Sequence, residues 1–222
     1  MRAEIIAGVD ADAFIVKLKD SRAEPQDIRV DLTMLLKAGV SKRPPFICKE
    51  VGKMGETAES LLAKGAIKQH FSTLANGSER TQIWLTQKFE QAAATEFREF
   101  DHYCGSSVVI DVAGRDATVS KPNAETLSLT LKAGVGEVFV YIASAATLDR
   151  NVSVDQVLAT ARDRANAAKA KGYENMLAAN QAWWRDFWSK SYIYLPADQV
   201  SLSIQKKWYY YLYLMASSTR GQ

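Results

Sequence analysis

Three carboxylates lie close together in the segment from Glu96 to Asp101, and they are the first candidates for chemistry. In a β-strand, alternation places Glu99 and Asp101 on one face. Glycoside hydrolysis uses two carboxyl groups roughly 5 to 9.5 Å apart across a cleft, a separation that this pair can reach. The preferred interpretation is simpler, with Glu99 and Asp101 on a solvated strand face and Phe97 packed inward. A small hydrolase that uses this pair therefore stays a secondary hypothesis.

Tryptophan rings offer a second kind of chemistry, because the apolar face of a pyranose can stack on a flat indole. Trp84 lies in an alternating segment, and Trp183 lies one position beside a helical apolar stripe. We predict Trp84 and Trp183 as substrate-binding residues for carbohydrate. Aromatic residues at helical spacing usually belong to a core, and we expect this of Trp184, Phe187 and Trp188.

The sequence lacks the patterns of several other kinds of site. No Gly-x-Ser-x-Gly elbow occurs, which argues against a nucleophilic α/β hydrolase. His70 and His102 are far apart, and neither belongs to a cluster with metal-ligand spacing. The segment Gly134–Gly136 lacks the third glycine and the following helix of a phosphate-binding loop. We therefore expect no metal ion, no cofactor and no catalytic residue that the sequence itself identifies.

Composition and charge narrow the range of partners. The 222 residues include 28 basic and 25 acidic side chains, and the net charge of +3 is spread along the chain. This balance predicts neither a nucleic-acid partner nor an anionic membrane. Cys48 and Cys104 can form at most one bridge, and free thiols are the preferred interpretation.

The sequence predicts neither an export signal nor a membrane span. Asp10 and Asp12 interrupt the N-terminal region before any apolar stretch is long enough for a signal peptide. The aromatic run from Trp208 to Met215 is much shorter than the roughly 20 residues that cross a bilayer. The cellular location is therefore left open.

Alternating apolar and polar residues predict an antiparallel β-sandwich over residues 1–150. The expected strands are 13–19, 28–32, 67–74, 81–89, 107–112, 126–131 and 138–143. We expect turns at Asn76–Gly77, 113–116, Lys121–Asn123 and 134–136, because glycine, proline and asparagine cluster there. Residues 41–65 are expected to form a long connection with one short helix near Glu56 to Ala63.

Helical periodicity begins at Ser153, where Ser153 and Gln156 form a predicted capping box. Gly172 is expected to end this helix, and a second helix follows from Tyr173. Asp198 is expected to cap a third helix. Its predicted inward positions are Leu202, Ile204, Trp208, Tyr211, Leu212 and Met215. The predicted fold class is thus α+β, an antiparallel sandwich followed by a C-terminal segment of two to three helices.

The region from Asn180 to Ile193 and the later run from Tyr209 to Arg220 resemble part of a known family. They are similar to the junction in bacterial glycoside hydrolases that join an N-terminal β-supersandwich to an (α/α)6 barrel, the α-L-fucosidase-like group. The matching positions are Trp183, Trp184, Phe187, Trp188, Ser191, Leu212, Tyr213, Arg220 and Gly221. Similar sequences commonly have a histidine before the Trp pair, whereas this chain has Asn180.

The resemblance implies a division into a sandwich at 1–150, linker helices at 151–195 and the first helix of a helical barrel at 196–222. The catalytic carboxylates of such enzymes lie farther along the barrel, so the resemblance carries no catalytic residue over to this chain. It implies that the partner is carbohydrate or a helical domain beyond residue 222.

Two functional hypotheses follow, the first from the resemblance and the second from the residues themselves. The first is the N-terminal, non-catalytic portion of a carbohydrate-active glycoside hydrolase. The alternative is a complete glycan-binding or self-associating β-sandwich module without catalysis, which forms a homo-oligomer through its C-terminal aromatic helix.

Overall fold

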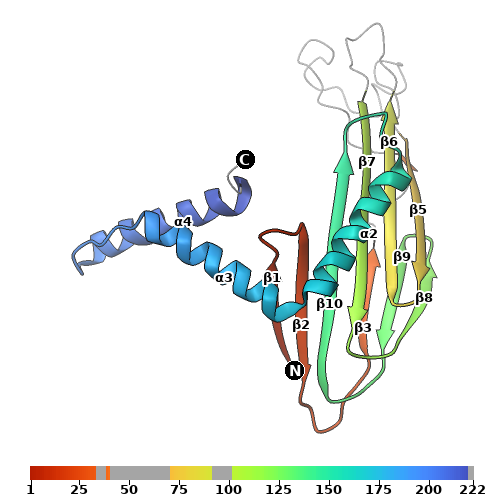
Figure 1. Ribbon diagram of the computed structural model, residues 1–222, viewed down its shortest axis with the longest axis horizontal. Coiled ribbons are helices and arrows are strands. Elements are labelled where there is room, and N and C mark those ends of the chain that lie inside the picture. The colour runs from red at the N-terminus through yellow and green to blue at the C-terminus, as the bar shows by residue number, and fades with distance from the viewer. Residues whose placement is uncertain (34–38, 41–70, 92–101, 220–222) are drawn as a thin grey trace, which may run out of the picture. The chain divides into compact units, whose positions relative to one another are not determined.

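A computed structural model of the chain describes residues 1–33, 39–40, 71–91 and 102–219 (Figure 1). Within these ranges, two antiparallel sheets are followed by three helices, which confirms the predicted α+β class. The strands are β1 (Arg2–Ala7), β2 (Ala13–Asp20), β3 (Ile28–Thr33), β4 (Gly39–Val40), β5 (Phe71–Glu79), β6 (Gln82–Gln91), β7 (His102–Ala113), β8 (Ala117–Asn123), β9 (Thr126–Leu131) and β10 (Gly136–Thr147). The helices are α2 (Val154–Lys171), α3 (Tyr173–Lys190) and α4 (Gln199–Thr219).

The larger sheet has seven strands in the order β1-β2-β10-β7-β6-β5-β4, and the smaller has three in the order β3-β9-β8. Alternation along the central strands sends side chains into two separate cores. On β10, Val138 and Val140 face the smaller sheet, whereas Tyr141 and Ala143 face helix α2. The larger sheet is therefore the middle of three layers, with α2 on one face and the smaller sheet on the other.

Helix α2 approaches the sheet closely because its buried stripe is made mostly of alanine. Ala161, Ala165 and Ala168 have no exposed surface. The predicted capping box is confirmed, since Ser153 Oγ accepts from the Gln156 amide and Gln156 Oε1 accepts from the Ser153 amide, at 3.2 and 2.8 Å. Gly172 ends the helix with φ of 75°, a conformation that favours glycine.

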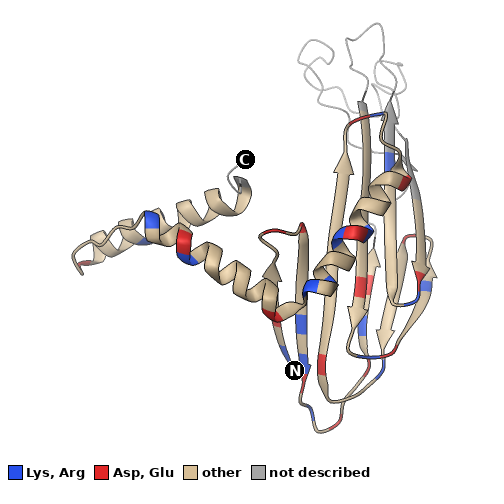
Figure 2. Ribbon diagram, in the orientation of Figure 1, with Lys and Arg blue, Asp and Glu red and all other residues tan. Residues whose placement is uncertain are grey.

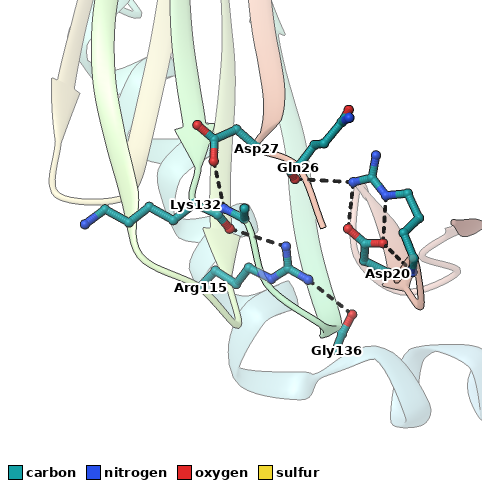
Figure 3. A network of polar contacts seen from close by, with 8 residues as sticks. Asp20, Gln26, Asp27, Arg115, Lys132 and Gly136 are labelled. Atoms are coloured by element: carbon teal, nitrogen blue, oxygen red, sulfur yellow. Dashed lines mark hydrogen bonds and ion pairs between the residues drawn. The ribbon is translucent and has the colours of Figure 1, made fainter. Parts of the chain in front are cut away.

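Three connections cross between the sheets at one end of the sandwich, and a polar network ties them together (Figure 3). Arg22 donates to both carboxylate oxygens of Asp20, at 2.9 and 2.7 Å, and to the carbonyl of Gln26. Arg115 donates to the carbonyls of Lys132 and Gly136. These contacts hold the β2–β3, β7–β8 and β9–β10 connections in place.

Several strand boundaries differ from the sequence-based predictions. Strand β5 continues through Asn76–Gly77, so the turn predicted there is wrong, and the chain instead turns at Arg80 and Thr81. A Cβ on Gly77 would lie 2.4 Å from the Trp84 ring, so glycine serves here to admit an indole rather than to form a turn. Residues Lys121–Asn123 end β8, where the pairing with β9 shifts register between Ser120 and Asn123.

The edge strands were the least visible in the sequence. Strands β1, β4 and β8 were not predicted, and each lies at an edge of its sheet. Strand β1 pairs with β2 from Arg2 opposite Lys19 to Ala7 opposite Phe14. Strands β7 and β10 are longer than predicted, with 12 residues each.

The chain divides into two compact units, residues 1–177 and 178–222. This boundary differs from the expected sandwich of 1–150, because α2 packs onto the larger sheet and belongs to the first unit. In the second unit, the remainder of α3 and α4 are held together by ring contacts. Among the described residues, no helix is both long and apolar enough to cross a membrane.

The Asp20–Arg22 pair predicts an acid-sensitive component of stability. The Asp20 side chain is fully buried, and hydrogen bonds from Arg22 hold the pKa of its carboxyl well below the ordinary value of 3.8. Because the folded pKa is the lower one, the stabilisation is present above the unfolded pKa and is lost as the pH falls toward the folded pKa.

We expect Asp20→Asn to lower the free energy of unfolding at pH 7. The difference in the free energy of unfolding between wild type and Asp20→Asn should narrow between about pH 5 and pH 2, as measured by urea unfolding at a series of pH values. Asp163→Asn, at an exposed position on α2, is the matched control and should leave the pH profile unchanged. A gap that stays constant with pH would contradict this role of the carboxylate.

Candidate functional site

Trp84 lies on β6 and faces α2, where its ring is held between two neighbours. Gly77, its partner across the β5–β6 pair, provides a surface without a side chain against which the indole packs. The Arg162 guanidinium from α2 lies over the ring, 4.0 Å from a ring centroid. This spacing is typical of a cation–π contact. The structure therefore places Trp84 half-buried beneath an arginine, and a sugar stacking on that covered face would have to displace Arg162.

Arg162 retains unused hydrogen-bonding capacity. Its Nε atom is buried and has no hydrogen-bond partner in the described part of the chain. Among the described residues it pairs with Glu79, at 4.0 Å, whose side chain is 66% exposed. An exposed pair at this distance contributes little binding energy. The guanidinium is thus fixed in position by Trp84 while its charge remains weakly compensated.

Asp111 is the buried acid of this region. It lies on β7, its side chain is 6% exposed, and Lys169 Nζ donates to both of its oxygens at 3.1 and 3.0 Å. Thr81 Oγ1 donates to the same carboxylate at 2.8 Å. Burial raises the pKa of the nearby Tyr141 hydroxyl, and the negative charge of Asp111 adds to this effect. Asp111 is therefore an ion-paired anchor that joins β7, the β5–β6 turn and α2.

These side chains surround a pocket of about 550 Å³ between the β5–β6 turn and α2. Its lining is Glu79, Arg80, Thr81, Gln82, Asp111, Arg162, Asn166, Lys169 and Ala170. The basic residues of α2 lie between its middle and its C-terminal end, from Arg162 to Lys171, and acidic residues occur on the helix as well as on the strands that it covers (Figure 2). The volume falls in the range of small-molecule sites, but the lining is more polar than such sites usually are.

Arg80 is unusual in its backbone. It lies in the turn between β5 and β6 with φ of 52°, and it is the one residue other than glycine with positive φ among the described residues. It forms no ion pair or hydrogen bond with another described residue. Side chains at positive φ carry a modest energetic cost, and such positions are common at functional sites.

Trp183 lies in the second unit, within an aromatic cluster that joins α3 to α4. Its ring stacks on Phe187 at 5.5 Å and meets Trp184 edge-on at 4.7 Å. Trp184 in turn stacks on Tyr213 of α4 at 5.3 Å. Trp84 and Trp183 belong to different compact units.

Helix α4 exposes much of its apolar surface. Four of its predicted inward positions are exposed, and the prediction was wrong for Leu202 (40%), Ile204 (53%), Tyr211 (62%) and Met215 (44%). Trp208 and Leu212 are half-buried, as are Trp184, Phe187 and Trp188 on α3, which were expected in a core. The reason is that a hairpin of two helices offers neighbours on only one side of each helix.

Several predicted residues lie outside the part of the chain that the structure describes. These are Glu99 and Asp101, Cys48, His70 and the connection over residues 41–65. Cys104, on β7, is half-buried and forms no disulfide with another described residue. No group of three or more His, Cys, Asp or Glu residues in the described ranges could hold a metal ion.

Scans of the chain against protein-family models and against curated proteins find no match. Function is therefore inferred from the residues and their geometry. Arg80, Arg162 and Lys169 were not identified from the sequence. One signal was available: Asp111 interrupts the apolar run from Val108 to Val112, and a lone carboxylate in such a run indicates a buried ion pair.

We expect Lys169→Met to destabilise the fold by about 1–3 kcal/mol, because it leaves the buried Asp111 carboxylate without its ammonium partner. The double variant Lys169→Met with Asp111→Asn should lose less stability than the sum of the losses in the two single variants. Urea unfolding of the four proteins provides the coupling energy. Lys132→Met, at an exposed lysine, should change stability by less than about 0.5 kcal/mol. Additive single effects would contradict the pairing.

Proposed function

We propose that this chain is the N-terminal, non-catalytic portion of a carbohydrate-active glycoside hydrolase, in which the sandwich and the α3–α4 hairpin support a helical catalytic domain. The exposed apolar surface of α4 is the observation that carries the proposal. Side chains along its whole length are open to solvent, including Val200 (70%), Ile204 (53%), Tyr211 (62%) and Met215 (44%). Contiguous apolar surfaces of this kind mark sites of association.

The charge pattern of α4 also favours burial against another helix. In 21 residues the helix carries only two charged side chains, Lys206 and Lys207, which are adjacent in sequence. A helix with one solvated face normally has charged residues at regular helical spacing. Helix α4 instead has tyrosine, leucine and methionine around most of its circumference between Trp208 and Met215. It resembles a helix packed within a larger helical assembly.

The resembling residues fall in two separate segments, and the structure brings the two segments into contact. Trp184 stacks on Tyr213, and Trp188 contacts Tyr209 with a centroid distance of 5.5 Å. Tyr209 also donates to the carbonyl of Ile193 at 3.0 Å. These contacts join the two segments into one hairpin, which we propose to be the linker helix and the first helix of the helical domain.

The second candidate function is self-association of a complete glycan-binding module through α4. The same exposed surface favours it, because a second copy would bury the same side chains. Trp84 and Trp183 are its candidate carbohydrate contacts, and a sugar would have to displace Arg162 to stack on the covered face of Trp84. The two candidates differ in what covers α4, namely another domain of the same polypeptide or another copy of this chain.

A dye-binding and light-scattering experiment tests the exposed surface. The chain of residues 1–222 should bind a hydrophobic dye, and the double variant Ile204→Lys with Tyr211→Lys should lose most of that signal with unchanged circular dichroism. Tyr192→Lys with Tyr194→Lys, which changes two exposed aromatic residues outside α4, is the matched control and should retain it. A monomer that binds no dye would count against the proposed function, and a dimer disrupted by the α4 variant would favour self-association.

The coding sequence that follows the codon for Gln222 provides a second test. We expect a continuing frame with paired amphipathic helices, and we expect glycosidase activity only in the product that includes them. Activity in residues 1–222 alone, or no continuing frame, would overturn the proposal.

A further inference from the structure

The polar pocket between the β5–β6 turn and α2 contains basic side chains that could bind a ligand. This inference does not depend on what covers α4. Two arginines with different surroundings line the pocket. Arg162 is held over Trp84 with 30% of its side chain exposed, and Arg80 is exposed in its turn and forms no ion pair with another described residue. Lys169 is already committed to Asp111 at 3.0 Å. The two guanidinium groups are therefore the cations that remain available to a ligand.

We propose that this pocket binds a small organic monoanion, specifically a carboxylate that also carries hydroxyl groups, such as a sugar acid. Guanidinium groups recognise carboxylates through paired, charge-assisted hydrogen bonds. Arg162 is suited to this role because the Trp84 ring fixes its plane before a ligand arrives. Pre-organisation of this kind reduces the entropy lost on binding.

The acidic residues of the pocket argue for a monoanion rather than a phosphate dianion. The lining contains two acids, Glu79 and Asp111, beside its three bases. Asp111 is neutralised by Lys169, but Glu79 is 66% exposed and only loosely paired with Arg162. A second ligand charge near Glu79 would be repelled, whereas a ligand hydroxyl could donate a hydrogen bond to it.

Two amides complete the match to a hydroxylated ligand. Gln82 Nε2 donates to Asn166 Oδ1 at 3.4 Å, a long contact, and the two side chains form no other hydrogen bond within the described residues. Each amide presents both a donor and an acceptor, as hydroxyl groups require. The volume of about 550 Å³ exceeds that of a carboxylate alone and leaves room for a hydroxylated body. Arg80, in its positive-φ turn, would contact the ligand from the opposite side to α2.

Titration calorimetry at low salt tests the site with D-glucuronate, D-glucose, acetate and inorganic phosphate. We expect glucuronate to bind at least tenfold more tightly than glucose and more tightly than phosphate, and we expect acetate to compete with it. Arg80→Ala and Arg162→Gln should each weaken glucuronate binding about tenfold or more. Arg185→Ala, which removes an exposed arginine of the second unit, is the matched control and should leave the affinity unchanged.

The variant Arg80→Gly distinguishes a loss of ligand binding from a loss of folding. Glycine relieves the positive φ, so this variant should unfold at an equal or higher temperature and still lose glucuronate affinity. The proposal is overturned if glucuronate does not bind, if both arginine variants bind it as wild type does, or if acetate fails to compete. Phosphate that binds as tightly as glucuronate would indicate a simple anion site. Glucose that binds as tightly as glucuronate would show that the ligand charge has no role. Either result overturns the assigned ligand class.

Discussion

The fold depends on one constraint, which is that the larger sheet has two apolar faces and both must be covered. Strands β7 and β10 alternate so strictly that neighbouring residues, such as Val140 and Tyr141, belong to different cores. Neither face can be left in water, because each buries a cluster of apolar side chains. The smaller sheet covers one face and α2 covers the other. The order of the strands, the crossings between sheets and the position of the pocket all follow from this arrangement.

Buried charge occurs where the layers must be held in register. At the end of the sandwich where three connections cross between the sheets, the Asp20 carboxylate accepts hydrogen bonds from Arg22, which is close in sequence. Beneath α2, Asp111 is satisfied by Lys169, which is far away in sequence. A buried ion pair contributes modest net stability, but an incorrect packing that separates the partners is strongly disfavoured. The first pair fixes a connection, and the second fixes the helix on the sheet.

The sequence was most informative where local chemistry alone determines the structure. The limits of β9 match the predicted 126–131, and the cap at Ser153 and the stop at Gly172 depend only on neighbouring residues. Asn76–Gly77 was misread because its role is set by Trp84 across the strand pair, not by its neighbours in sequence. Edge strand β1 escaped notice because half of its residues are exposed, none is fully buried, and its sequence shows little alternation.

The candidate site was less predictable than the fold, because its residues meet only through tertiary packing. Trp84 was identified as an aromatic residue in a strand, but nothing nearby in sequence indicates that Arg162 covers it. Helical spacing predicted Trp184, Phe187 and Trp188 on the packed face of α3, where they are half-buried, but four of the six inward positions that it predicted on α4 are exposed. It did not indicate whether a neighbour covers that face, which depends on elements outside the helix.

The alanine stripe of α2 has a consequence for how this protein can change over evolutionary time. Since Ala161, Ala165 and Ala168 set the gap between helix and sheet, each methyl group acts as a spacer. A larger residue would raise the helix and widen the space beside it, and glycine would allow it to settle lower. Substitutions at these alanine positions can thus change the volume of the pocket without altering any of its polar groups. Selectivity for larger or smaller molecules can therefore evolve through residues that do not contact the ligand.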